Sequence, residues 1–261
     1  MKNDKNKLFT CRLCKNKFFY DEMSEEHYPA RSVGNIDVGN FNLTNFIDLF
    51  QSNNIKKYNI KQLATKNNLE KIADEIFDKN IFKSTYPNGR TARTLCKKCN
   101  NFLGKYDEAY LKFFKADGLP KIVRGFMLET KYEIIKSIFA KFLSIPETKN
   151  EKFDFINFIK DKSICKYNGE WQLYFVRRDS PTDIMGLSDL NTGKLEYDEG
   201  VVYELSDEKF IFNLMNFKKH DCFEMNNIFD ITMNNYSLIT GVGENGGYHG
   251  LLLIQNTFDY K

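Results

Sequence analysis

The chain lacks any long apolar segment. No stretch of its 261 residues approaches 18 consecutive apolar side chains, so we expect no membrane span. The first residues, Met1–Lys7, are polar and charged and lead into no apolar region, so we also expect no secretory signal. Cysteine is scarce, with six residues, which is too few for a disulfide scaffold. These absences exclude membrane proteins and disulfide-rich secreted proteins, and they favour a cytoplasmic protein.

Charge is distributed unevenly along the chain. The overall composition, 42% hydrophobic and 28% charged residues, is that of an ordinary globular protein with enough chain to bury a core. Residues 1–120 carry 21 Lys and Arg against 14 Asp and Glu, a net charge of +7, whereas residues 121–261 carry 17 against 21, a net charge of −4. The basic front half fits an anionic partner, although a lysine-rich solvated face would give the same imbalance.

The hydrophobic pattern changes from helical to strand-like along the chain. Apolar residues recur at three- and four-residue spacing within residues 41–80, 98–116 and 121–145, which predicts helices there. Residues 84–93 contain a Pro-Asn-Gly sequence and are interpreted as a loop. After residue 164 the period changes to two. The predicted strands are 171–177, 195–197, 201–205, 210–214, 236–240 and 250–255, with hairpin turns at 191–193 and 244–247.

These patterns predict an α+β fold in two domains. Residues 1–150 form the first domain in this interpretation, with a helical insertion at about 35–90 followed by further helices. Residues 151–261 form a β-rich C-terminal domain built on an antiparallel sheet, whose role the sequence does not indicate.

Four of the six cysteines occur as two Cys-x-x-Cys pairs, Cys11 with Cys14 and Cys96 with Cys99. Four thiolates satisfy a tetrahedral Zn²⁺, and sites with four cysteines are usually structural. The 81 residues between the pairs are far more than an ordinary zinc ribbon has. A redox Cys-x-x-Cys is the rival interpretation, but that motif should open a helix after a strand of the thioredoxin type, and none is evident. The sequence therefore favours a structural zinc.

Further motifs accompany the cysteine pairs. Glu26-His27 is followed by Pro29 and Arg31, and the second pair is followed directly by Asn100. In the order Cys-x-x-Cys, Glu-His-x-Pro-x-Arg and Cys-x-x-Cys-Asn-Asn-x-x-Gly, the chain resembles the HNH (ββα-metal) endonucleases. More narrowly, it is similar to the branch whose fold is braced by a four-cysteine zinc. The resemblance covers residues 11–34 and 94–107, roughly a seventh of the chain.

The resemblance implies a role for each matching residue. In the family, the histidine of the acidic-His pair is the general base, and that position is His27; a histidine changes protonation near neutral pH, which suits the task. The acidic residue before it binds a divalent cation, and that position is Glu26. The residue after the last cysteine supplies a second ligand, here Asn100. Oxygen ligands suit Mg²⁺ or Mn²⁺. The resemblance thus implies an HNH ββα-metal core with zinc for folding and a magnesium-like cation for catalysis.

The chain departs from the family at one position. The middle asparagine of the HNH name normally lies a few residues before the second cysteine pair, but Thr91–Leu95 contains no asparagine. That scaffold residue is either absent, replaced by Thr91 or Arg93, or supplied by the insertion.

Other polar residues near the motif are also candidates. Asp107 lies seven residues after Asn100, on the same face of the expected helix, and could join the metal site, although a surface acid on an amphipathic helix has the same pattern. Basic residues in this region could neutralise phosphates without sequence preference. They are Arg31, Arg90, Arg93, Lys97, Lys98 and Lys105.

The leading hypothesis is a metal-dependent HNH endonuclease that acts on DNA. By family analogy, chains of this build serve in restriction, anti-phage defence or mobile elements. The acidic C-terminal domain is a poor candidate for general DNA binding, and it could instead contact a partner protein or a second copy of the chain. The alternative, favoured by the missing asparagine, is a non-catalytic zinc module that binds nucleic acid or protein. A thiol-redox protein is a third hypothesis, and it predicts no bound zinc.

Overall fold

The chain divides into two compact units in a computed structural model. Residues 1–35 and 90–261 form the larger unit, and residues 36–89 form the smaller one. The smaller unit coincides with the insertion expected at about 35–90, whereas the expected domain boundary near residue 150 falls inside the larger unit. The structure describes residues 7–36, 38–41, 82–86, 88–178, 192–218 and 224–241.

Two strands form the described part of the smaller unit. β4 (Val38–Phe41) pairs antiparallel with β5 (Phe82–Tyr86), with a shift of register between Asn40 and Phe41. The loop expected at 84–93 is therefore partly wrong at both ends, because its first residues continue β5 and Thr91–Ala92 form the strand β6. The turn after β5 closes where the Gly89 amide donates to the Tyr86 carbonyl oxygen at 2.8 Å. The helices expected within 41–80 lie outside the described residues.

Two helices form one layer of the larger unit. α4 (Lys97–Lys115) confirms the helix predicted at 98–116, and it ends where Gly118 adopts a φ of +62° and donates its amide to the Phe113 carbonyl oxygen. The single helix expected at 121–145 is instead two, α5 (Pro120–Val123) and α6 (Leu128–Lys141). Gly125 lies in the turn between them, which closes because its amide bonds to Ile122. Glycine disfavours a helix interior because it loses more conformational freedom there than other residues do. The apolar periodicity does not reflect this effect, so it predicted one continuous helix.

A six-stranded sheet forms the second layer of the larger unit. Its order is β11-β7-β10-β9-β8, with β12 parallel to β7 and the other pairs antiparallel. The strands predicted at 171–177, 195–197, 201–205 and 210–214 are confirmed, so the α+β class is correct. The bounds are β7 (Gln172–Arg178), β8 (Thr192–Tyr197), β9 (Gly200–Ser206), β10 (Phe210–Met215), β11 (Asn226–Asn227) and β12 (Thr240–Gly241).

Some details of the sheet differ from expectation. The turn expected at 191–193 is wrong, because Thr192 and Gly193 pair within β8 and the hairpin turns at Asp198 and Glu199. The strand expected at 236–240 shrinks to β12. The strand at 250–255 and the turn at 244–247 lie outside the described residues. Within the part of the chain that is described, no helix is both long and apolar enough to span a membrane.

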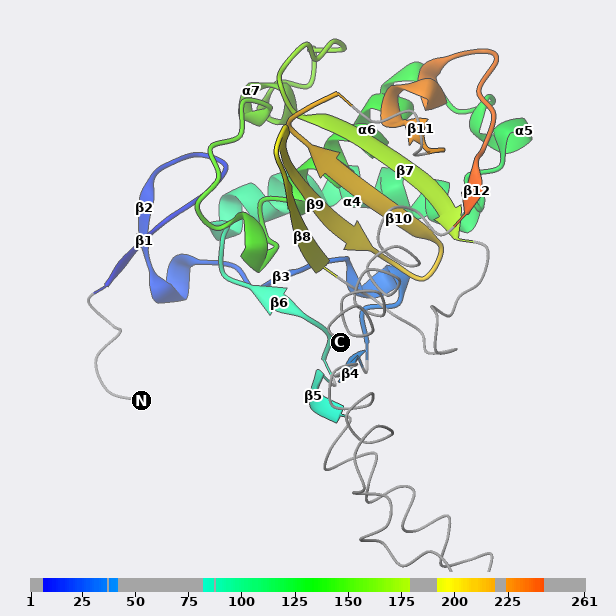
Figure 1. Ribbon diagram of the computed structural model, residues 1–261. Coiled ribbons are helices and arrows are strands. Elements are labelled where there is room, and N and C mark those ends of the chain that lie inside the picture. Colours follow the sequence, from blue (N-terminus) through cyan, green and yellow to red (C-terminus); the bar gives the residue numbers. More distant parts are fainter. Residues whose placement is uncertain are drawn as a thin grey trace, which may run out of the picture. The chain divides into compact units, whose positions relative to one another are not determined.

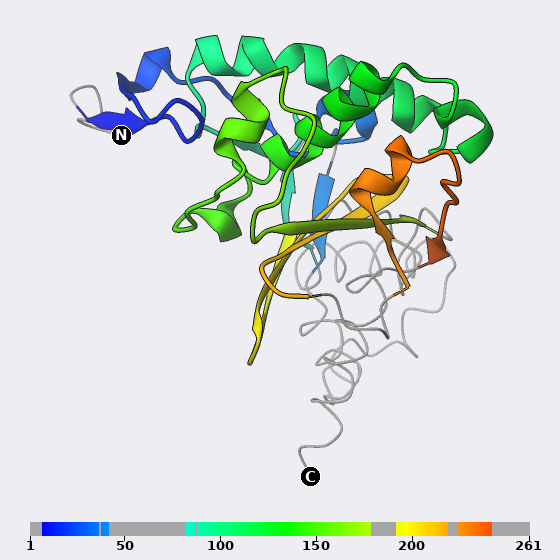
Figure 2. The same cartoon turned by 90° about the horizontal axis from the view of Figure 1, so that it is seen from above.

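An aromatic core joins the two layers. Helices α4 and α6 cover one face of the sheet (Figures 1 and 2). Phe113 of α4 packs against Phe210 of β10, with 4.9 Å between ring centroids, and against Phe175 of β7 at 5.9 Å. All six residues of β10 are buried, as expected for a central strand. Remaining short helices of the larger unit are η1 (Tyr20–Glu22), η2 (Arg31–Val33), η5 (Pro146–Thr148), α7 (Ile156–Lys160) and η6 (Ile228–Thr232).

Candidate metal centre and the strand–helix site beside it

The four cysteines of the two Cys-x-x-Cys pairs meet in the larger unit. Cys11 and Cys14 lie in the turn between β1 (Leu8–Thr10) and β2 (Lys17–Phe19), and the other pair opens α4. All four Sγ atoms lie within 4.8 Å of one another, and among the described residues they are the one group of three or more Cys, His, Asp or Glu placed to hold a metal ion. The fold therefore brings together two cysteine pairs that are separated by 81 residues in the sequence.

The cluster has the chemistry of a thiolate metal site. Burial by itself would raise the pKa of the Cys11 thiol, but backbone amides that donate to it lower that pKa overall; one of them is the Cys96 amide, 3.3 Å from Cys11 Sγ. Burial raises the pKa of Cys14 and of Cys99. Crowded thiols resist ionising together unless a cation offsets their charge, and four sulfur donors are the set that Zn²⁺ prefers. The residues present therefore fit a metal ion such as zinc.

Arg12 joins the first cysteine pair to the helical layer, a role that no sequence pattern indicates. Its guanidinium donates to the Leu143 carbonyl oxygen at 2.8 Å and to the Thr148 carbonyl oxygen at 2.6 Å, both just beyond α6. Burial lowers the pKa of Arg12 to about 10, against the raising effect of Glu151. An arginine between two cysteines is ordinarily a solvated side chain, and its partners here are more than 130 residues away in sequence.

A short antiparallel ribbon leads into α4. β3 (Glu26–His27) pairs with β6 (Thr91–Ala92), which places His27 opposite Thr91. The pairing continues through a bridge between Met23 and Cys96, so the ribbon runs up to the cysteine cluster. β3, β6 and α4 thus form two strands followed by a helix, with the four clustered cysteines at the junction.

Asn35 ties the two strands of the ribbon together. Its side-chain amide donates to the carbonyl oxygens of Pro29 at 2.7 Å and Arg90 at 3.0 Å, and its oxygen accepts from the Arg90 amide at 2.7 Å. Asn35 is fully buried, and it spans the two chain ends from which residues 36–89 depart. Sequence reasoning missed it, since one asparagine before an insertion resembles any turn residue.

Glu26 and His27 point to opposite sides of β3, because successive strand residues alternate. Glu26 is 5% exposed and forms an ion pair with Lys141 of α6. The Lys141 Nζ also lies 2.8 Å from Oδ2 of Asp107, which in turn accepts from Ser137. Burial raises the pKa of Glu26 against the pull of Lys141; burial would lower the pKa of Lys141, but the two carboxylates raise it. Lys141 thus contacts both acids that the sequence suggests as cation ligands. No sequence pattern indicates this role for Lys141.

Asn100 has a different neighbour. Its side-chain amide donates to Ser24 Oγ at 2.8 Å, which fastens the first turn of α4 to the segment before β3. Of the two expected cation ligands, Glu26 is thus engaged by an ion pair, while Asn100 uses its amide nitrogen and not the oxygen that would ligate a cation.

The six basic candidates divide into two groups. Arg90 is buried, and Arg93 lies 4.5 Å from the Tyr20 ring centroid while forming an ion pair with Glu25 at 3.5 Å. Arg90 is thus enclosed by the protein, and Arg93 is held against it by these two contacts. The exposed residues are Arg31, Lys97, Lys98 and Lys105.

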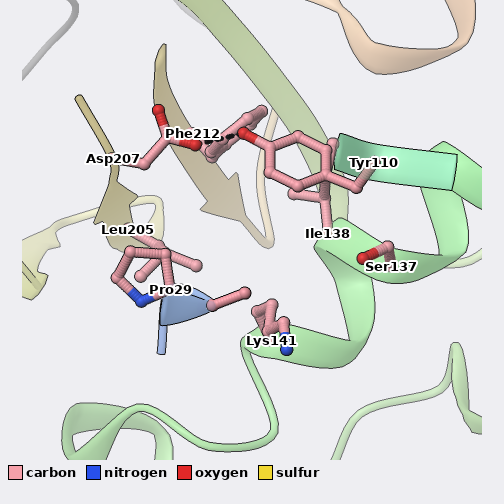
Figure 3. Close-up of a pocket in the computed structure, with 9 residues that line it drawn as sticks. Pro29, Tyr110, Ser137, Ile138, Lys141, Leu205, Asp207 and Phe212 are labelled. Atoms are coloured by element: carbon pink, nitrogen blue, oxygen red, sulfur yellow. Dashed lines mark hydrogen bonds between the residues drawn. The ribbon is translucent and has the colours of Figure 1, made fainter. Parts of the chain in front are cut away.

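A small cavity lies beside Lys141 (Figure 3). Its volume is about 10 Å³, room for roughly one water molecule. Lys141 and Ser137 of α6 lie on one side, and Tyr110 donates a hydrogen bond to Asp207 on another. Asp207 is 1% exposed, and its carboxylate also accepts from the Phe210 amide at 2.8 Å.

Replacement of Asp207 is expected to change how stability depends on pH. Burial raises the pKa of Asp207 from 3.8 to about 6, so the folded chain binds this proton more tightly than the unfolded chain. The protonated acid adds about 3 kcal/mol to the free energy of unfolding below pH ~4. This contribution is lost as the pH rises through ~6. Asp207→Asn has no such proton. Urea unfolding of both proteins at pH 4 and pH 7 measures this, and equal pH slopes would contradict it.

Comparison of the chain with family models, with curated proteins and with solved structures finds no significant match.

Proposed function

We propose that the chain is an endonuclease of the HNH type that hydrolyses phosphodiester bonds in DNA, with His27 as general base. The observation that carries the proposal is the order of elements around His27. The β3–β6 ribbon holds Glu26 and His27, and α4 follows it directly from the cysteine cluster. Two strands and a helix beside a four-cysteine site are the arrangement that the resemblance implies.

Asn35 adds support by accounting for the middle asparagine of the family pattern, which is missing from its usual place. Thr91–Leu95 contains no asparagine, yet Asn35 holds the ribbon by three hydrogen bonds to backbone atoms of Pro29 and Arg90. Asn35 lies where the insertion begins, and supply by the insertion is one of the alternatives that the sequence leaves open for the scaffold asparagine. We propose that Asn35 takes that role.

The proposed chemistry uses groups of this chain. His27 would accept the proton of the attacking water, the usual task of a positioned imidazole. Exposed lysines of α4 would hold the phosphate backbone of the DNA. Zinc, if bound by the cysteines, would keep α4 and the ribbon together. Glu26 does not fit a free Mg²⁺ or Mn²⁺ site as it stands, because Lys141 engages its carboxylate, so no step is assigned to that cation.

Nicking of supercoiled plasmid tests the proposal. Purified protein is incubated with plasmid in Mg²⁺, in Mn²⁺ or in EDTA, and conversion to open circles is followed on a gel. We expect conversion that depends on His27. Absence of conversion in all three conditions, together with retained DNA binding, would overturn the nuclease assignment.

A second candidate function rests on one observation. Because Lys141 engages Glu26, the expected catalytic cation lacks a ready ligand, which favours a non-catalytic zinc module that binds nucleic acid. The plasmid experiment separates the two functions, since this module binds DNA without cutting it.

Replacement of two exposed lysines is expected to weaken DNA binding at every sequence. Lys98 and Lys105 lie seven residues apart on one face of α4 and are exposed. If each contacts one phosphate, changing both to Gln should flatten the slope of log K against log salt by about two units. Fluorescence anisotropy on two unrelated duplexes at several salt concentrations measures this. The matched control changes exposed Lys149 and Lys160 to Gln, and an equal loss in the control would assign the effect to net charge.

A further inference from the structure

Glu26, Lys141 and Asp107 come from three different elements and meet inside the larger unit. The Lys141 Nζ forms ion pairs with Glu26 Oε1 and, at 2.8 Å, with Asp107 Oδ2. Glu26 is 5% exposed and Lys141 is 7% exposed, so both charges have lost most of their water. The ammonium therefore lies between two carboxylates, where a metal ion shared by the same two acids would also lie.

Burial of Glu26 and Lys141 leaves little water at their ion pair. Mg²⁺ usually keeps several of its waters when it binds a protein, so a hydrated cation is poorly suited to these buried groups while the ammonium is there. A divalent cation at Glu26 would also lie next to the positive charge of Lys141, which repels it. Cation binding at these acids and the Lys141 ion pairs are therefore alternatives.

We infer that the Lys141 ammonium takes the place of the divalent cation between Glu26 and Asp107, so that Glu26 can ligate a metal ion only when Lys141 is displaced or removed. This inference rests on the proposed function, which gives Glu26 its place in the nuclease motif. Lys141 is then a positioning residue. Its charge holds the Glu26 carboxylate in place and opposes the binding of a cation there.

Direct titration with Mn²⁺ tests the inference on the zinc-loaded, full-length chain. The concentration of free Mn²⁺ is followed by electron paramagnetic resonance, which needs no substrate. Wild type and Glu26→Gln should bind Mn²⁺ equally, because Lys141 already engages the Glu26 carboxylate in the wild type and the variant has no carboxylate at that position. Lys141→Met keeps an unbranched side chain of similar length but removes the charge. Its Mn²⁺ affinity should rise by about tenfold or more, since the repelling charge is gone and two acids are released.

Two further variants identify the source of any gain. Adding Glu26→Gln to Lys141→Met should abolish the increase in Mn²⁺ affinity. Lys131→Met removes the same charge from another buried lysine of α6, 5% exposed, and should leave Mn²⁺ affinity at the wild-type value. If Lys141→Met folds poorly without metal, Mn²⁺ should raise its melting temperature while leaving that of the wild type unchanged, which a purely structural role of Lys141 would not produce.

Two results would overturn the inference. One is loss of Mn²⁺ binding in Glu26→Gln compared with wild type, because Glu26 would then be a cation ligand despite Lys141; this arm uses no lysine variant and decides the matter even if Lys141→Met fails to fold. The other is a folded Lys141→Met with wild-type Mn²⁺ affinity. Neither result depends on DNA cleavage. Failure of plasmid nicking would remove the nuclease assignment and leave the Mn²⁺ comparison standing.

Discussion

Cys96→Ser is expected to prevent the chain from holding its fold. Cys96 is 2% exposed, is the residue directly before α4 and forms a β-bridge with Met23 at the end of the ribbon. If the four cysteines hold one zinc, their affinity contributes about 10–16 kcal/mol to folding, in a chain whose total stability is on the order of 5–15 kcal/mol. Loss of one ligand should therefore remove most of the zinc and leave insoluble or unfolded protein. Zinc content, far-ultraviolet circular dichroism and thermal melting measure this.

Cys165→Ser is the matched control for the cysteine cluster. Cys165 is an exposed free thiol, and it is not among the four clustered cysteines. This variant should retain about one zinc per chain and the wild-type melting temperature. Removal of zinc from the wild type with a chelator should reproduce the defect of Cys96→Ser. A metal-free Cys96→Ser protein with wild-type stability would show that the cluster does not hold the fold together.

His27→Ala is expected to lose roughly 10²–10⁴-fold in the rate of plasmid nicking, the usual contribution of a general base. The side chain of His27 is half-buried on β3, on the opposite side of the strand from Glu26 and its ion pairs. Zinc content and melting temperature should therefore change little. Single-turnover nicking with excess enzyme measures the rate of the chemical step without the contribution of product release.

His27→Gln separates proton transfer from hydrogen bonding. Glutamine keeps a polar side chain that donates and accepts hydrogen bonds but cannot accept a proton near neutral pH. Both variants should be slow to a similar extent, and both should bind DNA as the wild type does. Equal nicking rates in wild type and His27→Ala would remove His27 from the mechanism. A variant that is slow only because it binds DNA poorly would assign His27 to recognition.

Local sequence was sufficient to predict the elements that depend on neighbouring residues. The helix expected at 98–116 is α4, and four strands of the sheet lie where the alternation of residues 171–214 predicts them. Helical and strand periodicity depend on residues only a few positions apart, so both can be recognised in the sequence alone. The same reasoning extended a helix across Gly125, because a break in backbone geometry does not interrupt an apolar pattern.

The two cysteine pairs are an intermediate case. Each pair was recognisable from its spacing, and four thiols favoured zinc, but their meeting depends on the ribbon and on Arg12, which fastens the first pair to the end of α6. The sequence thus supplied the ligands, and packing over more than 80 residues supplied the site.

The partners of the buried polar residues at the site are far apart in the sequence, so no local pattern predicts these contacts. Lys141 meets Glu26 across 115 residues, and Asn35 meets Arg90 across 55. A lysine in an amphipathic helix and an asparagine before an insertion are ordinarily solvated, so their residue types gave no warning. Burial made the difference: once a carboxylate or an amide leaves water, it must find a partner inside the protein, and which partner it finds is settled by how the helices and strands pack.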